Sequence, residues 1–493
     1  MEHTAVLNRP ENRRLEKAVS YAEWVSLARE RDRIAGKMAW RTKDESQFFD
    51  YRSIRARIEQ LRIFRESGDD HGLLFTLNEG IHGNMDGMAN EHLWGEALTG
   101  TKFLISAYVE AIADALVHLA RPDVNSISAA EKRDFFERAL HCYGCSSLLL
   151  SGSGAFLYFH IGVVRAMVEQ RLLPDIIAGS SGGALVGAVV CTHTESELET
   201  LLSSHEFDRL SELGKQMAGR KPSGTKPQTQ DDIAATLAAL IPDITFQEAF
   251  ALTGRHLNVS VAPAEKHQNG RMLNAITSPN VYIRDAVLAS CAVPGIFAPV
   301  QLMAKDATLA RVAYLPERRW VDGSVTHDLP TKRLSRLYGV NHHIVSQANP
   351  LAMPFATETK QVTSPFQVLQ QAATTTAKAL FNAQVALLDR PLAVFPQLHR
   401  MMTIAQSVIN QEYSGDINII RPVVLWTPTK LLSQPSVTEM DDLIDLGERI
   451  AWPKLEMIRV QTLISRTLTA ILRDLEPTGS IGALSSARKG PQK

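Results

Sequence analysis

The order of apolar and polar residues near the middle of the chain predicts two strand–turn–helix units in succession. Leu148 to Leu150 is a short apolar run typical of a buried strand, and a turn containing Gly152 and Gly154 follows it. Apolar residues then recur every three or four positions, which predicts an amphipathic helix over 161–171. A second apolar run at 176–178 leads through another glycine-rich turn into a helix. This alternation indicates an α/β domain with a mostly parallel sheet.

Helical spacing also dominates residues 20–140, which we predict to be largely helical. One helix in this region carries an apolar stripe and five arginines, at positions 52, 55, 57, 62 and 65. Such a basic face can contact phospholipid head groups. A solvated helix surface explains it equally simply and is the interpretation that we favour.

Shorter elements follow the central block. Thr245 and Glu248 form a capping box that predicts the start of a short helix, and Gly254 predicts its end. The pattern farther along the chain predicts strands over 257–261, 320–322, 343–346 and 417–426, and helices over 283–291 and 452–475.

The second glycine-rich turn carries a serine in a pattern that has chemical meaning. Gly179-x-Ser181-x-Gly183 matches the nucleophile elbow, with the required strand before it and helix after it. The helix N-terminus would stabilise a developing alkoxide on Ser181, and the turn from Gly152 to Ala155 would supply N–H donors to an oxyanion. The alternative is that both are tight turns of an ordinary α/β domain.

A candidate acid for this serine is Asp322. Residues 320–322 read as the end of a strand, and Gly323 follows as a turn residue. An Asp-Gly pair alone is commonly a plain turn. Together with the serine pattern, it suggests that Asp322 is a base for Ser181.

Four blocks of sequence, in order, carry a resemblance to a known family. They are SGSGAFLYFHIGVV from residue 151, GSSGG from residue 179, NAITSPNVYIRDAVLASCAVPGIFAPVQLMAKD from residue 274, and WVDGSVTHDLP from residue 320. The chain resembles the patatin-like phospholipases. More closely, it resembles the subgroup with an extra N-terminal domain, which includes triacylglycerol lipases of yeast lipid droplets and a plant seed-oil lipase. The resemblance runs from about Tyr21 to about Leu475.

The resemblance implies a catalytic Ser-Asp dyad rather than a triad, with Ser181 as the nucleophile and Asp322, in its Asp-Gly motif with Gly323, as the base. It implies no catalytic role for His327. An ordinary aspartate, with a pKa near ~3.9, is a poor base for a hydroxyl group. We therefore expect burial to raise the pKa of Asp322 in a deeply buried site, which also suits the acyl chain of a lipid ester.

The oxyanion turn of the family matches Gly152, Ser153, Gly154 and Ala155. The sequence departs from the family here, because Ser153 stands where glycine is common. Phe156 replaces a basic residue that many patatins carry just after the turn, as in the neutral-lipid branch of the family.

A proline-containing apolar loop follows the helix predicted over 283–291. In patatin-like proteins this block lies near the active site, which implies that Val293, Pro294, Ile296 and Phe297 line an acyl pocket. A core turn explains the same apolar residues equally well.

For the fold, the resemblance implies a three-layer α/β/α sandwich with added N-terminal and C-terminal helices. We expect a helical N-terminal domain over 1–140, a patatin-like catalytic domain over 141–350, a mostly helical extension over 351–475 and a disordered tail over 476–493. The implied activity is hydrolysis of carboxyl esters of phospholipids or glycerides through an acyl-serine intermediate.

Two other functions remain open. An acyltransferase would share the dyad and differ only in the acceptor, and a lipid-binding scaffold would keep a vestigial site. A dinucleotide-binding domain also begins with a strand and Gly-x-Gly. This alternative fits the chain less well. The third glycine of the dinucleotide-binding motif is displaced here, and the acidic residue expected at the end of the second strand is missing.

Composition narrows the expected partners. The 493 residues have a formal net charge of −1, which favours neither nucleic acid nor an anionic membrane. Four cysteines do not make a disulfide framework at this length, and a lone Cys142-x-x-Cys145 is weak evidence for a metal, so we expect no metal and no cofactor. The sequence shows no signal peptide and no run near ~20 apolar residues. We expect a cytoplasmic protein with a lipid substrate and peripheral contact with a membrane or lipid droplet, in an oligomeric state that stays open.

Overall fold

The computed structural model describes residues 14–81, 87–203, 228–265, 270–324, 328–350, 352, 411, 413–422, 431 and 433–475. Contacts divide the chain into two compact units. The first contains Met1–Ser146, Leu337–Asn341 and Trp452–Lys493, and the second contains Ser147–Arg336 and His342–Ala451. The long helix α21 (Val437–Leu475) therefore begins in the second unit and ends in the first. The predicted domain limits at 140, 350 and 475 stay predictions, and the predicted tail lies outside the described residues.

The first unit is helical, as predicted. Its helices before the central block are α3 (Tyr21–Ile34), α4 (Lys37–Thr42), α5 (Tyr51–Ser67), α6 (Asp70–Gly80), the short η2 (Glu91–Leu93), α7 (Phe103–Ala120) and α8 (Ala129–Tyr143). Local sequence sets their ends. The Asp50 carboxylate caps α5 by accepting the amides of Arg52 and Ser53, and Gly68 ends the same helix with a φ of +69°.

Helix α7 is the one helix among the described residues with the length and apolar composition of a membrane span. The sequence analysis expected no run of this kind. Half of α7 is buried, and residues such as Tyr108 and Leu116 belong to the core of the first unit together with Ile54 and Leu61 of α5. The apolar residues of α7 thus pack in the core of the first unit.

The arginines of α5 are largely paired with carboxylates. Arg62 lies 2.5 Å from Glu59 and 2.7 Å from Glu66, and Arg55 pairs with Asp44. These pairs neutralise much of the positive charge on the helix. They favour the interpretation of this face as a solvated surface.

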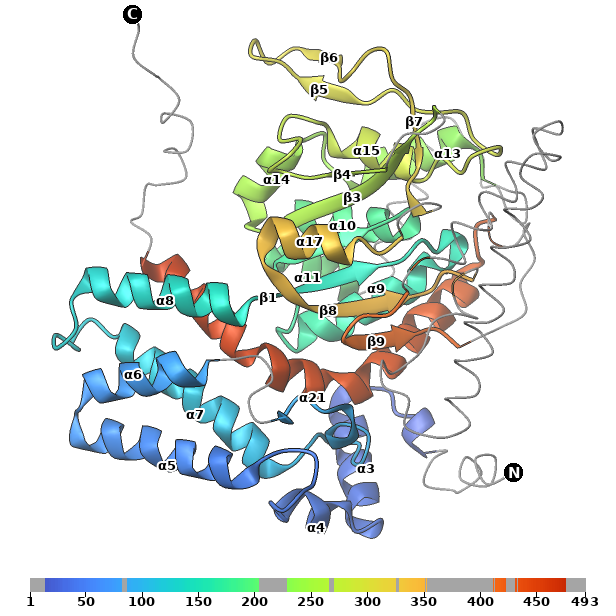
Figure 1. The fold of residues 1–493 in the computed structure, drawn as a ribbon. Helices are drawn as coiled ribbons and strands as arrows, with labels where there is room; N and C mark the ends of the chain where they lie inside the picture. Colours follow the sequence, from blue (N-terminus) through green and yellow to red (C-terminus); the bar gives the residue numbers. More distant parts are fainter. Residues whose placement is uncertain are drawn as a thin grey trace, which may run out of the picture. The chain divides into compact units, whose positions relative to one another are not determined.

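A central sheet organises the second unit (Figure 1). Its order is β4-β3-β2-β1-β8-β9, and a seventh strand, β7, also pairs with β3. The β2 strand is parallel to both β1 and β3, and β8 is parallel to β9, whereas β4 and β7 run antiparallel to β3. The strands are β1 (Cys145–Leu150), β2 (Ile176–Gly179), β3 (His256–Pro263), β4 (Arg271–Leu273), β7 (Trp320–Asp322), β8 (Val340–Gln347) and β9 (Ile417–Ile420), with a separate hairpin of β5 (Met303–Lys305) and β6 (Arg311–Ala313).

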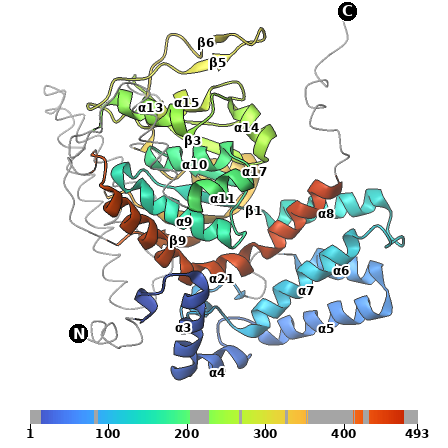
Figure 2. The ribbon, with the colours of Figure 1, turned by 180° about the vertical axis from the view of Figure 1, so that it is seen from behind.

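Helices cover both faces of this sheet, which confirms the predicted α/β/α arrangement. Figure 2 shows α9, α10 and α11 over one face, and Figure 1 shows α17 over the other. The capping box at Thr245 and the end of its helix at Gly254 are confirmed. The helices of this unit are α9 (Leu157–Glu169), α10 (Gly182–Thr192), α11 (Glu195–Ser203), α13 (Gln230–Leu240), α14 (Phe246–Thr253), α15 (Ile283–Ser290) and α17 (Thr331–Tyr338).

The sheet register brings the ends of β2 and β7 together. His256 to Val259 of β3 pair with β2, whose last residue is Gly179. Farther along β3, Val261 to Pro263 pair with β7, so that Val261 lies opposite Asp322. On its other edge β3 pairs with β4. The β7 strand therefore occupies the β3 edge just beyond the end of β2, and the last residue of β7 meets the turn that follows β2.

Two glycines allow α21 to touch α9. A Cβ atom on Gly162 would lie 2.0 Å from the carbonyl oxygen of Ile444, and one on Gly447 would lie 2.2 Å from that of Phe159. Arg165 and Glu448 form an ion pair beside this contact. The beginning of α21 thus supports, at backbone distance, the helix that follows the oxyanion turn.

Candidate active site

Ser181 lies in the turn between β2 and α10 in a conformation that few residues adopt. Its φ is +52° and its ψ is −123°, a strained conformation for any residue except glycine. A Cβ atom on Gly179 would lie 2.4 Å from the carbonyl oxygen of Gly183, and one on Gly183 would lie 2.3 Å from that of Leu150. Both flanking positions therefore require glycine. This geometry is that of a nucleophile elbow.

A second serine holds the elbow in place. The amide of Ser181 donates to the hydroxyl oxygen of Ser290 at 2.9 Å, and that hydroxyl donates to the carbonyl of Ser260 at 2.8 Å. Ser290 belongs to α15 and Ser260 to β3. The strained turn is thus fixed to the strand that also pairs with β7. The sequence analysis did not single out Ser290, because a serine in a helix of small residues is an ordinary packing residue.

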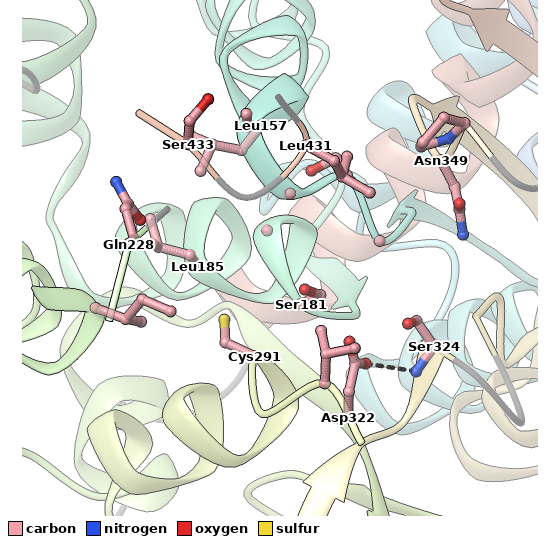
Figure 3. Close-up of a pocket in the computed structure, with 18 of the residues that line it drawn as sticks. Leu157, Ser181, Leu185, Gln228, Cys291, Asp322, Ser324, Asn349, Leu431 and Ser433 are labelled. Carbon is pink, nitrogen blue, oxygen red and sulfur yellow. Dashed lines mark hydrogen bonds between the residues drawn. The ribbon is translucent and has the colours of Figure 1, made fainter. Parts of the chain in front are cut away.

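Asp322 ends β7 and is 3% exposed. Its carboxylate accepts the amide of Ser324 at 2.8 Å, and the side chain of Ser181 lies beside it on the wall of the same pocket (Figure 3). Burial raises the pKa of Asp322 to about 6, against the opposing effect of the Ser324 and Ser181 groups. The direction and cause are those expected from the sequence.

Cys291 lies against the same serine at the end of α15 (Figure 3). Burial and the nearby charge of Asp322 raise the pKa of the Cys291 thiol well above its usual range. A protonated thiol is a weak nucleophile. The hydroxyl of Ser181, beside a carboxylate, is therefore a better candidate nucleophile than the thiol of Cys291.

The turn after β1 presents its amides unequally. The amide of Gly152 donates to the Asp328 carboxylate at 2.7 Å. Within the part of the chain that the structure describes, the amides of Ser153 and Gly154 have no hydrogen-bond partner. Gly154 has a φ of +51°, which glycine adopts without strain. The structure thus leaves the middle of the predicted oxyanion turn free to donate and occupies the first of its four amides.

The side chain of Ser153 fills the gap between the turn and the elbow. Its hydroxyl is buried and has no partner among the described residues, and a Cβ atom on Gly182 would come within 2.4 Å of it. A glycine at 153 would leave this space empty. The departure from the family pattern is therefore accommodated by Gly182, the residue after the nucleophile.

Ser181 and Asp322 line a pocket of about 200 Å³. Val293 and Phe297 lie on its wall, as predicted from the sequence, but Pro294 and Ile296 are not among the residues that line it. Ile296 is instead 54% exposed. Other apolar side chains on the wall are Leu157, Leu185, Ile233 and Leu431.

Besides Ser290, three parts of the site were missed by sequence reasoning. Asp328 is fully buried beside the oxyanion turn, Asn349 lines the pocket, and Leu431 covers Gly154, where a Cβ atom would lie 2.6 Å from its carbonyl oxygen. An acid six residues beyond Asp322 was the one available signal for Asp328. No sequence pattern near Asn349 or Leu431 predicts that these residues belong to the site. His327 lies outside the described residues.

Comparisons with known proteins agree with this arrangement. A family model described as a domain of unknown function (DUF3336) matches residues 8–141, and one described as patatin-like phospholipase matches residues 148–334. The triacylglycerol lipase ptl3 of Schizosaccharomyces pombe is 32% identical over 477 residues, which cover 93% of this chain and 97% of that protein.

Two longer relatives match most of this chain. The triacylglycerol lipase SDP1L of Arabidopsis thaliana is 32% identical over 95% of this chain and 60% of its own length. A patatin-like phospholipase domain-containing protein of Cryptococcus neoformans is 33% identical over 93% of this chain and 54% of its own. This chain thus spans little more than half the length of these two relatives.

A strained serine at the end of a parallel strand, with a buried aspartate beside it, makes a candidate serine-nucleophile site on an α/β fold. The chain belongs to the patatin-like phospholipase family, in the subgroup whose patatin domain follows a DUF3336 domain.

Proposed function

We propose that this protein hydrolyses carboxyl esters of lipids through an acyl-serine intermediate on Ser181, with Asp322 as the base. The observation that carries the proposal is the strained Ser181 beside the buried Asp322 carboxylate, where both residues line one apolar pocket. An ester carbonyl in that pocket lies within reach of the hydroxyl, and its acyl chain finds an apolar wall. The names of the related triacylglycerol lipases agree with this activity.

The first half of the reaction acylates the serine. Asp322 accepts the Ser181 proton as the serine oxygen attacks the ester carbonyl, and the carbonyl electrons move onto its oxygen. The free amides of Ser153 and Gly154 donate to this oxyanion. The tetrahedral intermediate collapses, the carbon–oxygen bond to the alcohol breaks, and the proton held by Asp322 leaves with the alcohol.

The second half releases the fatty acid. Asp322 takes a proton from a water molecule, whose oxygen attacks the acyl-serine carbonyl. Collapse of this second intermediate breaks the bond to the serine oxygen and returns the proton to Ser181. With a pKa of about 6, Asp322 is ionised at neutral pH and is a stronger base than an ordinary aspartate.

The pocket favours a neutral lipid over a phospholipid. Among the described residues that line it, the one charged side chain is Asp322, and none is a lysine, an arginine or a histidine. A phosphate drawn into this space would lose its hydration without gaining a cation, and it would meet a like charge. The uncharged glycerol ester of an acylglycerol avoids both costs. We therefore propose acylglycerols as the substrate class.

The loop 293–299 suggests how such a substrate is reached. Val293 and Phe297 line the pocket, whereas Ile296, between them, is 54% exposed. All seven residues of this loop are uncharged. We propose that the loop touches the surface of a membrane or lipid droplet from the cytoplasmic side, so that the acyl chain passes directly from the lipid into the pocket.

A substrate panel tests the proposal. Fatty-acid release is measured from emulsified tri-, di- and monoacylglycerols and from phosphatidylcholine, with wild type beside Ser181→Ala, whose folding is checked by circular dichroism. We expect release from acylglycerols by wild type alone, and at least ten times slower release from phosphatidylcholine. Wild type that is inert on every lipid would favour a scaffold with a vestigial site. Acyl transfer to an added alcohol in place of hydrolysis would favour an acyltransferase.

A further inference from the structure

Asp328 is a buried carboxylate that the proposed reaction does not use directly. It is 0% exposed, and its two oxygens have different partners. One oxygen accepts the amide of Gly152 at 2.7 Å, and the other accepts the side-chain amide of Asn349 at 2.9 Å. The carboxylate therefore joins the beginning of the oxyanion turn to a residue on the pocket wall.

The backbone of Asp328 makes two further contacts in the same place. Its carbonyl accepts the hydroxyl of Ser180 at 3.0 Å, and its amide donates to the side chain of Gln411 at 2.7 Å. Ser180 directly precedes the nucleophile. One residue thus contacts both the oxyanion turn and the nucleophile elbow.

We propose that Asp328 is the positioning residue of this site, and that it sets the distance between the oxyanion donors and Ser181. By occupying the amide of Gly152, it fixes the turn so that the amides of Ser153 and Gly154 receive the oxyanion. The proposal rests on the proposed function, because an oxyanion forms only if Ser181 attacks an ester.

Burial makes the charge of this carboxylate costly. Burial raises the pKa of Asp328 to about 7, and the nearby charge of Asp322 raises it further, although hydrogen bonds from Gly152 and Asn349 oppose the shift. A neutral asparagine would accept the same amide without the loss of hydration that a buried charge suffers. Asparagine is therefore the conservative replacement at position 328, because it keeps an acceptor for the amide of Gly152 and removes the charge.

Three variants separate positioning from a purely structural role. Asp328→Ala removes both acceptors, whereas Asp328→Asn keeps an oxygen for the amide of Gly152. Asp416→Ala is the matched control, because the Asp416 carboxylate also accepts a backbone amide, that of His343, at 2.7 Å, but it lies just before the edge strand β9 and does not line the pocket. Each is assayed for kcat and KM on an acylglycerol that wild type hydrolyses, and for thermal unfolding.

The expected result is a loss in kcat that the conservative variant largely restores. Asp328→Ala should lower kcat on the order of 100-fold with KM nearly unchanged, because a misplaced oxyanion site weakens binding of the transition state alone. Asp328→Asn should stay within about tenfold of wild type, and Asp416→Ala should lower the unfolding temperature while kcat changes less than about threefold.

Other outcomes would overturn the proposal. A kcat close to wild type in folded Asp328→Ala would show that the turn keeps its position without this carboxylate. Equal losses in the Ala and Asn variants would assign the effect to the charge, and a rise in KM alone would assign it to the pocket wall. If Asp328→Ala does not fold, Ser180→Ala decides, because it removes one link to Asp328 and should lower kcat without raising KM. An inert wild type would instead contradict the proposed function.

Discussion

Ser181 lies beside the buried Asp322 carboxylate, where the turn after β2 meets the end of the antiparallel strand β7. The two residues are 141 positions apart in the sequence. They meet because both strands pair with consecutive parts of the same edge of β3. Because burial raises the pKa of Asp322, we expect it to act as a base without a histidine.

The rate of ester hydrolysis should depend on the ionisation of Asp322. A base must be unprotonated, so kcat/KM should fall as the pH is lowered through about 6, and at pH 5 it should be roughly a tenth of its plateau. The measurement is a pH profile on an uncharged ester between pH 4.5 and 8.5. Asp328, with a pKa of about 7, lies close by, and repeating the profile with Asp328→Asn separates the two groups. A flat profile would exclude Asp322 as the base.

The raised pKa of Asp322 should also lower the stability of the folded protein at pH values above this pKa. The folded-state pKa of Asp322 lies above its unfolded value of 3.8, so the folded protein binds more protons between about pH 4 and 6, and stability falls as the pH rises through this window. At pH 8, Asp322→Asn should therefore be more stable than wild type by on the order of 2 kcal/mol. Urea unfolding at pH 8 and pH 4 measures the difference, which should shrink at the lower pH. Equal stability at pH 8 would contradict the raised pKa.

The elbow glycines should tolerate no side chain. Gly179→Ala would place its Cβ atom 2.4 Å from a backbone oxygen, and we expect a loss of stability above about 2 kcal/mol, with loss of activity. Gly187→Ala, in α10, is the matched control, because its Cβ atom would meet side chains at 3.4 Å, an ordinary contact. Thermal unfolding of both variants checks this, and similar unfolding temperatures would mean that the elbow relaxes easily.

The exposed Ile296 should matter on a lipid surface and not in solution. Ile296→Asp should lower the hydrolysis of emulsified triacylglycerol on the order of tenfold. The reason is that an isoleucine side chain inserted into the lipid contributes at least ~1.4 kcal/mol of binding free energy, which the aspartate variant loses. Hydrolysis of a soluble short-chain ester should stay within about twofold. Leu252→Asp is the control: Leu252 is 52% exposed, close to the 54% of Ile296, but it lies in α14, outside the loop 293–299. An equal loss on both substrates would assign Ile296 to the pocket instead.

The sequence predicted those features that a short pattern encodes. The strand–turn–helix units, the capping box at Thr245 and the elbow glycines each depend on neighbouring residues, and the structure contains them. The loop at 293–299 was predicted only in part, since Val293 and Phe297 line the pocket whereas Ile296 faces solvent.

Long-range contacts escaped prediction. The amide of Gly152 donates to the carboxylate of Asp328, which lies 176 positions later in the sequence. No local pattern around Gly152 predicts this acceptor. The contact of Gly447 with α9 likewise depends on where a helix that is distant in the sequence packs. From the sequence alone, a glycine inside a helical pattern indicates only a less stable helix. Contacts of this kind are determined by the packing of the whole chain and not by residues that are neighbours in the sequence.

Covalent capture of the nucleophile tests the central claim most directly. An alkyl fluorophosphonate, which mimics the tetrahedral intermediate, is incubated with wild type, Ser181→Ala and Asp322→Asn, and the adduct is located by peptide mass spectrometry. The account predicts one adduct, on the peptide that contains Ser181, no adduct in Ser181→Ala, and labelling slowed on the order of 100-fold in Asp322→Asn. Labelling of another residue at the wild-type rate, or an unchanged rate in Asp322→Asn, would contradict the dyad.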